Sequence, residues 1–418
     1  YSAGYAFTAI GAMMTSGDRE LTIYTLTLNT AVYAVSAYIF VQPFWLYLST
    51  ALVPLIALLT LDYHQALTAP WVAGFFMALS FLYFAAGQWL DRRSGHASGT
   101  VSPFAMPFYA PSYLLSAIAL VVASAEKSLA LAIYAAGAGL YAVSAWALRE
   151  PLFLYPAVWL TTVPYYLLMT LTPLHSRWYG LGWLPLIIVC ITAGRYAFPA
   201  RQPRIGDFRV LLLALARPAT PFYLLAYGLT LLMVAVSWQD QPVLACAFAA
   251  ATVVCLASAA LFRRTAWLYP GLTAAHASLA TGTSFYFSAA SAHAIALPFL
   301  ALSWTLALVG LFFSRRATPP RPTTGDWAFT GHLAAPGWAS PFFQFVAFDL
   351  IFWQLVALPA VDKTVVLGVG YAALLALFAT LWVDAALVYA ALGYLLLTLG
   401  SAFRWAELPF AFRMACMA

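Results

Sequence analysis

Two stretches of the chain, "YAVSAYIFVQPFWLY" from Tyr33 to Tyr47 and "YAVSAWALREPLFLY" from Tyr141 to Tyr155, are identical at eight of their fifteen positions. Both are mostly apolar, and both carry a proline at the same place, Pro43 and Pro151. They begin 108 residues apart. Self-similarity at a fixed spacing is typical of a chain built from repeated structural units.

The composition places this chain in a membrane. Hydrophobic residues make up 64% of the sequence, charged residues only 8%, and the mean hydropathy is +0.87. In soluble domains roughly a quarter of the residues are charged. Apolar runs fill nearly the whole length, which leaves no stretch long enough for a soluble domain of ordinary size.

Cutting the sequence at clusters of Pro, Gly, Arg and Asp gives segments long enough to cross about 30 Å of hydrocarbon as helices. The runs are apolar on every face and lack the alternation of barrel strands, so we expect helices. The expected spans are 1–15, 21–40, 44–61, 70–90, 107–124, 128–147, 152–172, 180–197, 219–237, 243–262, 266–287, 294–313, 341–359, 365–383 and 385–403, with a sixteenth starting near residue 408.

An acidic residue near the end of every fourth loop groups these spans into fours. The markers are Asp18, Glu126, Asp240 and Asp362. Eighteen residues after each marker stands a hydroxyl residue (Ser36, Ser144, Ser258, Thr380), and thirteen before it stand Tyr5, Tyr113, Tyr227 and Asp349. The predicted fold is therefore all-α: a polytopic membrane protein of about 15–16 transmembrane helices in four tandem repeats, the last incomplete. The repeats cover residues 1–98, 99–210, 211–325 and 326–418.

Four crossings per repeat mean that every repeat enters the membrane from the same side, so the repeats are parallel. The loops on one side carry thirteen Arg residues, and the loops on the other carry Arg19, Lys127, Arg177, Lys363 and Arg404. Because basic residues concentrate in cytoplasmic loops, we expect the Arg-rich side and the start of the chain to be cytoplasmic. The expected location is the inner (cytoplasmic) membrane of a prokaryote.

Motifs that carry chemistry are missing from the sequence. There is no nucleophile elbow, zinc-protease motif, phosphate-binding loop or dinucleotide fingerprint. The four cysteines form no C-x-x-C pair, so no metal site or disulfide framework is predicted. We predict no catalytic residue and no nucleic-acid binding, and the sequence identifies no cofactor. The expected partners are the lipid bilayer and other membrane protein subunits.

Three histidines recur in loops between the third and fourth helices of the repeats: His64, His175 and His293. They follow their markers by 46, 49 and 53 residues, so they need not occupy equivalent positions. Polar capping at the membrane interface is the simpler interpretation. A proton or metal site shared by the repeats would require the three side chains to converge.

One position breaks the repeat pattern. Asp349 stands where the other repeats have tyrosine, about 12 Å into its helix, and His276 lies about 15 Å into a helix that enters from the same side. An ionisable group at that depth costs several kcal/mol unless it is paired or hydrated. We therefore predict an intramembrane polar site in which Asp349 and His276 face protein, bonded to each other or lining one pocket. The alternative is a protonated Asp349 bonded to a backbone carbonyl or hydroxyl.

These observations leave three classes of function open. The first is a non-catalytic scaffold or accessory subunit of a larger membrane assembly, favoured by the scarcity of intramembrane ionisable groups. The second is a transporter or lipid flippase, which should contain a polar cavity. The third is a membrane subunit that carries a pigment or cofactor, for which His276 is the only well-placed ligand.

Overall fold

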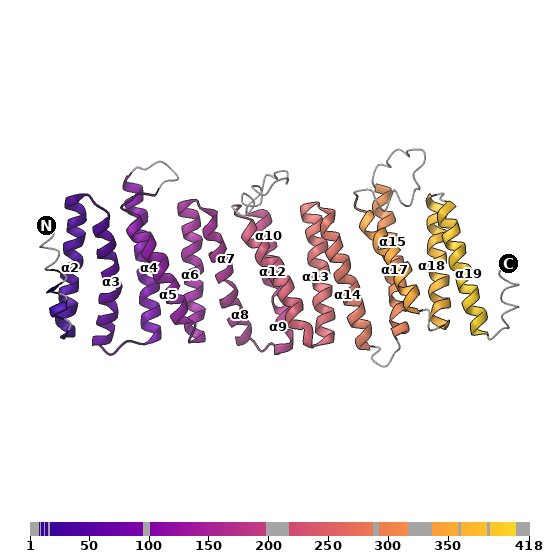
Figure 1. Cartoon of the computed structure of the whole chain (residues 1–418), viewed down its shortest axis with the longest axis horizontal. Helices are drawn as coiled ribbons and strands as arrows, with labels where there is room; N and C mark the ends of the chain where they lie inside the picture. The colour runs from indigo at the N-terminus through magenta and orange to yellow at the C-terminus, as the bar shows by residue number, and fades with distance from the viewer. Residues whose placement is uncertain are drawn as a thin grey trace. The chain divides into compact units, whose positions relative to one another are not determined.

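The computed structural model describes residues 17–94, 101–197, 217–286, 292–316, 337–357, 361–382 and 385–406, and scattered positions between 8 and 15. Everything in these ranges is helix, turn or loop. The chain forms two compact units: unit 1 is Tyr1–Leu174 with Val189–Ala226, and unit 2 is His175–Ile188 with Tyr227–Ala418. Within each unit the helices stand side by side and their connections lie at the two ends of the helices (Figure 1). The expected spans at 1–15 and near 408 fall largely outside the described residues.

Unit 1 contains α2 (Arg19–Phe40), α3 (Phe44–Tyr63), α4 (Ala69–Ser94), α5 (Met106–Ala123), α6 (Lys127–Leu148), η1 (Pro151–Phe153), α7 (Leu154–Leu160) and α8 (Thr162–Leu171). Unit 2 contains η2 (Ser176–Trp178), α9 (Tyr179–Gly182), η3 (Ser237–Gln239), α13 (Gln241–Phe262), η4 (Thr265–Trp267), α14 (Leu268–Tyr286), α15 (Ala292–Arg316), α17 (Ser340–Ala357), α18 (Val361–Trp382) and α19 (Ala385–Trp405). Helices α10 (Leu184–Tyr196) and α12 (Thr220–Val236) have residues in both.

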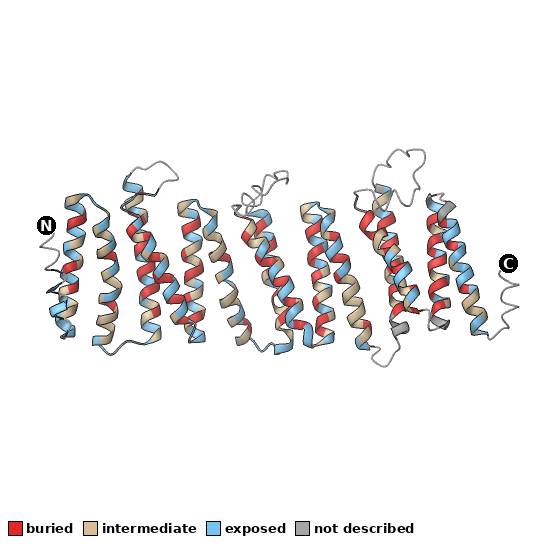
Figure 2. Cartoon of the chain, viewed as in Figure 1, coloured by how far each residue is buried: buried red, intermediate tan, exposed pale blue. Residues whose placement is uncertain are grey.

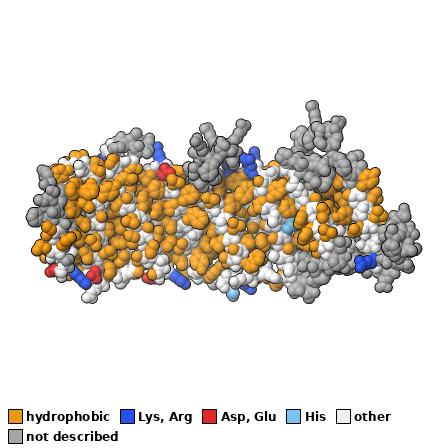
Figure 3. All heavy atoms as spheres, viewed as in Figure 1, with side chains coloured by type: hydrophobic (Ala, Val, Ile, Leu, Met, Phe, Trp, Pro, Cys, Tyr) orange, Lys and Arg blue, Asp and Glu red, His pale blue; other side chains and the backbone are white. Residues whose placement is uncertain are grey.

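Thirteen helical segments in the described ranges are long and apolar enough to cross a membrane. These segments mark a multi-pass membrane protein. Helix α14 is as long as the others but is not among the thirteen, because His276 and several Ser and Thr residues lower its hydropathy. Hydrophobic side chains dominate the face drawn in Figure 3, and charged ones gather near the helix ends.

Four helices, α2, α6, α13 and α18, are each 22 residues long. An acidic residue directly precedes the first three. Asp18 accepts hydrogen bonds from the N–H groups of Glu20 and Leu21, and Asp240 accepts one from the N–H of Val243. Such caps satisfy the first free N–H groups of a helix and fix where it begins.

The fourth expected marker, Asp362, was misplaced. It does not end the loop, because α18 begins one residue earlier, at Val361. Asp349 is the tenth residue of α17, and the tenth residues of α5 and α12 are Leu115 and Leu229, which are both buried. Asp349 therefore corresponds to these leucines and not to the tyrosines. The chain therefore carries a buried carboxyl group where the corresponding helices carry leucine.

The 22-residue helices share one recurrence that was not predicted from the sequence, and they also carry the column of hydroxyl residues that was. The residue after each of the first three 22-residue helices is left-handed: Val41, Arg149 and Arg263, with φ of 52°, 54° and 52°. The hydroxyl groups of Ser36, Ser144 and Ser258 each donate to the carbonyl oxygen four residues earlier. Thr380, the expected fourth member, lies two residues beyond the corresponding position, which Phe378 occupies; it is exposed and donates to the carbonyl of Leu377, three residues earlier.

Closely packed helix pairs cross two of the expected repeat boundaries. Helices α4 and α5 pack extensively on each other, as do α15 and α17. A glycine allows each close approach: a Cβ on Gly87 would lie 2.8 Å from the Tyr109 ring, and one on Gly310 would lie 2.8 Å from the Phe343 ring. The boundaries expected near residues 98 and 325 thus separate helices that are close partners in space.

Burial follows this pairwise packing. Each helix carries buried residues on part of its length and circumference and exposed residues elsewhere (Figure 2). Each of the thirteen segments contains a most apolar stretch of 18 residues. Between 17% and 50% of the residues in that stretch are buried. Every one of these helices therefore offers at least half of its residues, in whole or in part, to lipid or to another protein.

Candidate functional site

A buried polar cluster lies near the middle of four helices of unit 2. It contains His276 on α14, Ser303 on α15, Asp349 on α17 and Tyr371 on α18. His276 is the ninth residue of its 19-residue helix, and Asp349 is the tenth of its 18. His276 and Asp349 thus lie about 12 to 14 Å from the starts of their helices, close to the centre of the hydrocarbon region.

Asp349 is the centre of the cluster and is fully buried, with 0% of its surface exposed. Its Oδ1 lies 3.1 Å from Nε2 of His276 and accepts a hydrogen bond of 3.2 Å from Nε1 of Trp353. Its Oδ2 lies 2.9 Å from Oγ of Ser303 and 3.2 Å from Nε2 of His276. Three side chains therefore surround the carboxyl group, which offsets much of the cost of burying it.

The two ring nitrogens of His276 are both engaged. Nδ1 lies 2.7 Å from the backbone oxygen of Leu272. A carbonyl oxygen only accepts hydrogen bonds, so Nδ1 carries a proton. Nε2 faces the carboxyl group of Asp349. In this arrangement His276 has no nitrogen left to bind a metal or a pigment.

One further proton completes this network. With that proton on Nε2, the pair is an imidazolium and a carboxylate; with it on Asp349, the carboxylic acid donates to a neutral imidazole. Both arrangements have zero net charge. Removing the proton would leave the Nε2 lone pair facing a carboxylate in an apolar region, which is strongly unfavourable. The pair is built to hold one proton that either partner can carry.

Ser303 gives the network a second adjustable hydrogen bond. Its Oγ lies 2.8 Å from the carbonyl oxygen of Phe299 and 2.9 Å from Oδ2 of Asp349. A hydroxyl has a single proton, so it donates to one of these oxygens at a time. The Ser303 hydroxyl donates to Asp349 when the carboxyl is ionised and is free to turn to Phe299 when it is not.

Aromatic rings hold the polar side chains in place. The rings of Phe299 and Trp353 stack with their centroids 3.8 Å apart, and the His276 ring lies 5.0 Å from that of Phe345. Tyr371, also fully buried, lies with its hydroxyl beside Ser303 and Asp349. It provides a further donor or acceptor next to the carboxyl group.

Asp349 and His276 thus lie within hydrogen-bond distance of each other, one of the two arrangements expected for them, but His64 and His175 are not part of the cluster. His64 is exposed at the end of α3, where its ring packs against Tyr63. His175 is exposed before η2 and accepts from the N–H of Arg177. His293 lies in the first turn of α15, and its side chain is outside the described residues. Within the described ranges, no three His, Cys, Asp or Glu side chains group in a way that could hold a metal ion.

Two partners of Asp349, Ser303 and Trp353, were not predicted from the sequence. Trp353 follows Asp349 by four residues, which places it on the same face of a helix. Ser303 precedes Gly310 by seven residues, as the buried Ser80 precedes Gly87. Both signals are visible in the sequence, although neither by itself indicates a partner for an acid.

The chain matches no protein-family model, no curated protein and no solved structure. A function for it therefore has to be inferred from the geometry of the helices and of the buried cluster.

Proposed function

We propose that this protein is a non-catalytic scaffold or accessory subunit of a larger membrane assembly, built from four parallel tandem repeats. The observation that carries the proposal is the low burial of the membrane-spanning segments. In none of them are more than half of the residues in the most apolar 18-residue stretch buried. A helix that lines an enclosed path is packed by protein on most sides. Helices that pack mainly on their chain neighbours, as here, present long surfaces for partners instead.

The repeats are supported by the recurrences within the chain. Four helices share one length, and aromatic residues Tyr109, Tyr223 and Phe343 each stand eighteen residues before such a helix begins. Each of these aromatics packs on a glycine: Gly87, Gly194 and Gly310, respectively. The repeats at 1–98, 99–210, 211–325 and 326–418 are sequence units in this proposal, because their end helices pair across the boundaries.

Orientation follows from the basic residues at the helix ends. If successive helices cross the membrane in alternating directions, one side receives the C-terminal ends of α4, α6, α13 and α15. Each of these ends carries an arginine: Arg92, Arg149, Arg263 and Arg315. We infer that this side is the cytoplasmic side of a prokaryotic inner membrane. Cysteines placed at Ser94 and at Ser128 should react with a membrane-impermeant reagent from the cytoplasmic and the outer side, respectively. The reverse labelling would overturn this orientation.

The scaffold proposal is tested by photo-crosslinking in native membranes. A photoreactive phenylalanine analogue at Tyr38 or Trp146, which are 86% and 78% exposed, should join the chain to a small set of discrete membrane proteins. The same analogue at the buried Tyr109 serves as a control and should give crosslinks only within the chain. Lipid adducts alone at both exposed positions, with a particle of monomer mass in mild detergent, would contradict the proposal.

The buried cluster favours a second function, a transporter or lipid flippase driven by protons. The observation in its favour is the His276–Asp349 pair, whose Nε2 and Oδ1 atoms lie 3.1 Å apart near the middle of their helices. Intramembrane ionisable pairs are characteristic of proton relays in pumps and transporters. Replacing both members of the pair distinguishes the two proposed functions. Only a proton-driven transporter would need the proton that they hold.

A further inference from the structure

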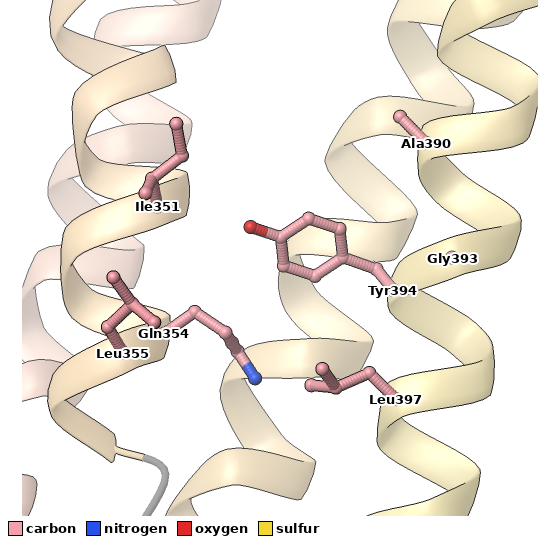
Figure 4. Close-up of a pocket in the computed structure, with 7 residues that line it drawn as sticks. All are labelled: Ile351, Gln354, Leu355, Ala390, Gly393, Tyr394 and Leu397. Atoms are coloured by element: carbon pink, nitrogen blue, oxygen red, sulfur yellow. The ribbon is translucent and has the colours of Figure 1, made fainter.

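A groove of about 370 Å³ runs between α17 and α19 (Figure 4). Its walls are apolar, with Ile351 and Leu355 on α17 and Leu397 on α19. These three side chains are 64%, 59% and 42% exposed, so the groove opens onto the lipid-facing surface of the helices. The volume is in the range of ligand-binding clefts.

Small residues create the space in this groove. Ala390 and Gly393 of α19 line it, and a Cβ added to Gly393 would meet no atom within 4 Å. The hydroxyl of Tyr394 donates to the backbone oxygen of Leu350 at 2.7 Å and ties the two helices together at this level. The groove is therefore a supported feature of the packing, with room for a slender apolar chain.

One polar side chain in the groove has unused hydrogen-bonding capacity. Gln354 is 5% exposed and lines the groove. Its Nε2 is 3.4 Å from the oxygen of Thr364, which is at the limit of a hydrogen bond, and its Oε1 has no partner in the described part of the chain. Buried polar groups are rarely left in this state.

A basic residue stands in line with the groove. Positions 390, 393, 397 and 404 of α19 are separated by three, four and seven residues, so they share one face of the helix. Arg404 lies in the last turn of α19 and is exposed, about 10 Å beyond Leu397 along the axis. An apolar groove, a polar side chain and a cation thus follow one another along one face.

We propose that this groove binds a phospholipid with an anionic head group. One acyl chain lies between α17 and α19, the glycerol ester region meets the Gln354 carboxamide, and the phosphate pairs with Arg404. The carboxamide suits the ester region because its Nε2 carries two N–H groups: one makes the long contact with the Thr364 oxygen, and the other can donate to an ester carbonyl oxygen. The guanidinium of Arg404 suits a phosphate because it offers paired donors as well as charge.

The test uses the full chain purified in detergent and native mass spectrometry of lipid binding. The probes are phosphatidylglycerol and phosphatidylcholine with identical acyl chains. The first lipid bound should be phosphatidylglycerol, with about fivefold higher affinity, because one basic residue at a membrane surface contributes about 1 kcal/mol toward an anionic lipid. Arg404→Gln should abolish that preference and leave the binding of phosphatidylcholine unchanged.

Gly393→Leu fills the groove and should weaken the binding of both lipids about tenfold. The matched control is Gly228→Leu on α12, another exposed helical glycine at which an added Cβ meets nothing within 4 Å. This control should bind both lipids like the original protein. Equal affinity for the two lipids, or unchanged binding in Gly393→Leu, would overturn the proposal. A neutral apolar molecule that co-purifies with the protein and is lost in Gly393→Leu would also overturn it.

Discussion

Replacing Asp349 with leucine is expected to lower the free energy of unfolding by about 3–5 kcal/mol, because it removes one partner of a buried polar pair. Leucine is the matched replacement, since Leu115 and Leu229 occupy the corresponding positions in their helices. In the variant, His276 Nε2 and the Trp353 N–H would be buried with no acceptor or donor facing them. Reversible unfolding of the purified protein in mixed micelles measures the change.

The double variant Asp349→Leu with His276→Leu should recover most of that loss. Replacing both members of a buried pair by apolar residues is often neutral or stabilising, because no charge is left unpaired. The neighbouring Phe348→Leu, at a side chain that is 54% exposed, is the control and should change stability by less than about 1 kcal/mol. A double variant as unstable as the single one would show that the pair is not the source of the effect.

The same double variant distinguishes the two proposed functions. In a scaffold, His276 and Asp349 contribute packing and hydrogen bonds, so the stable double variant should still give the crosslinks of the original protein. In a proton-driven transporter, the variant would fold and assemble but could not carry the proton on which transport depends. Loss of growth or transport with crosslinks intact would favour the second function.

Gly310→Ala is expected to destabilise the protein by about 1–3 kcal/mol through overpacking. The new methyl group would lie 2.8 and 3.0 Å from two carbons of the Phe343 ring, and Phe343 is fully buried and cannot move aside easily. The loss should appear as a lower midpoint of thermal unfolding in detergent.

Gly74→Ala on α4 provides the control for this effect. A Cβ there meets nothing within 4 Å, so the change should raise stability by up to about 1 kcal/mol, the helix propensity difference between the two residues. Adding Phe343→Leu to Gly310→Ala should restore part of the loss by making room for the methyl group. Equal effects of the two alanines would contradict close packing at Gly310.

Helix positions could be predicted well from the apolar runs, because lipid leaves the backbone few alternatives to helix. The expected spans 44–61 and 243–262 compare with the observed Phe44–Tyr63 and Gln241–Phe262. Breaks inside a run were harder to predict. The expected helix 152–172 is divided into α7 and α8 at Thr161, near Pro164, whereas Pro54 and Pro111 lie inside unbroken helices. A proline removes one N–H donor, but local packing decides whether the helix continues.

The buried pair could be predicted in part. Its two members were identified by their polarity and depth, which the bilayer makes costly enough to require a partner. The repeat alignment that singled out Asp349 was two residues off, because α18 begins at Val361, one residue before the acidic residue that was expected to end the loop. Ser303 and Trp353 were missed because neither residue type is unusual in a membrane helix.

The polar character of α14 has a consequence for how the protein is made. A segment that carries His276 with several Ser and Thr residues partitions weakly into lipid as it leaves the ribosome. Its closest packing partner is α13, which has the highest mean hydropathy of all the spans, 2.3, and is synthesised just before it. We expect the two helices to insert into the bilayer together as a hairpin, because packing on α13 stabilises the inserted α14. His276 would then already be in the membrane when Asp349 is synthesised. The hydrogen bond between them would form only after α17 has also inserted.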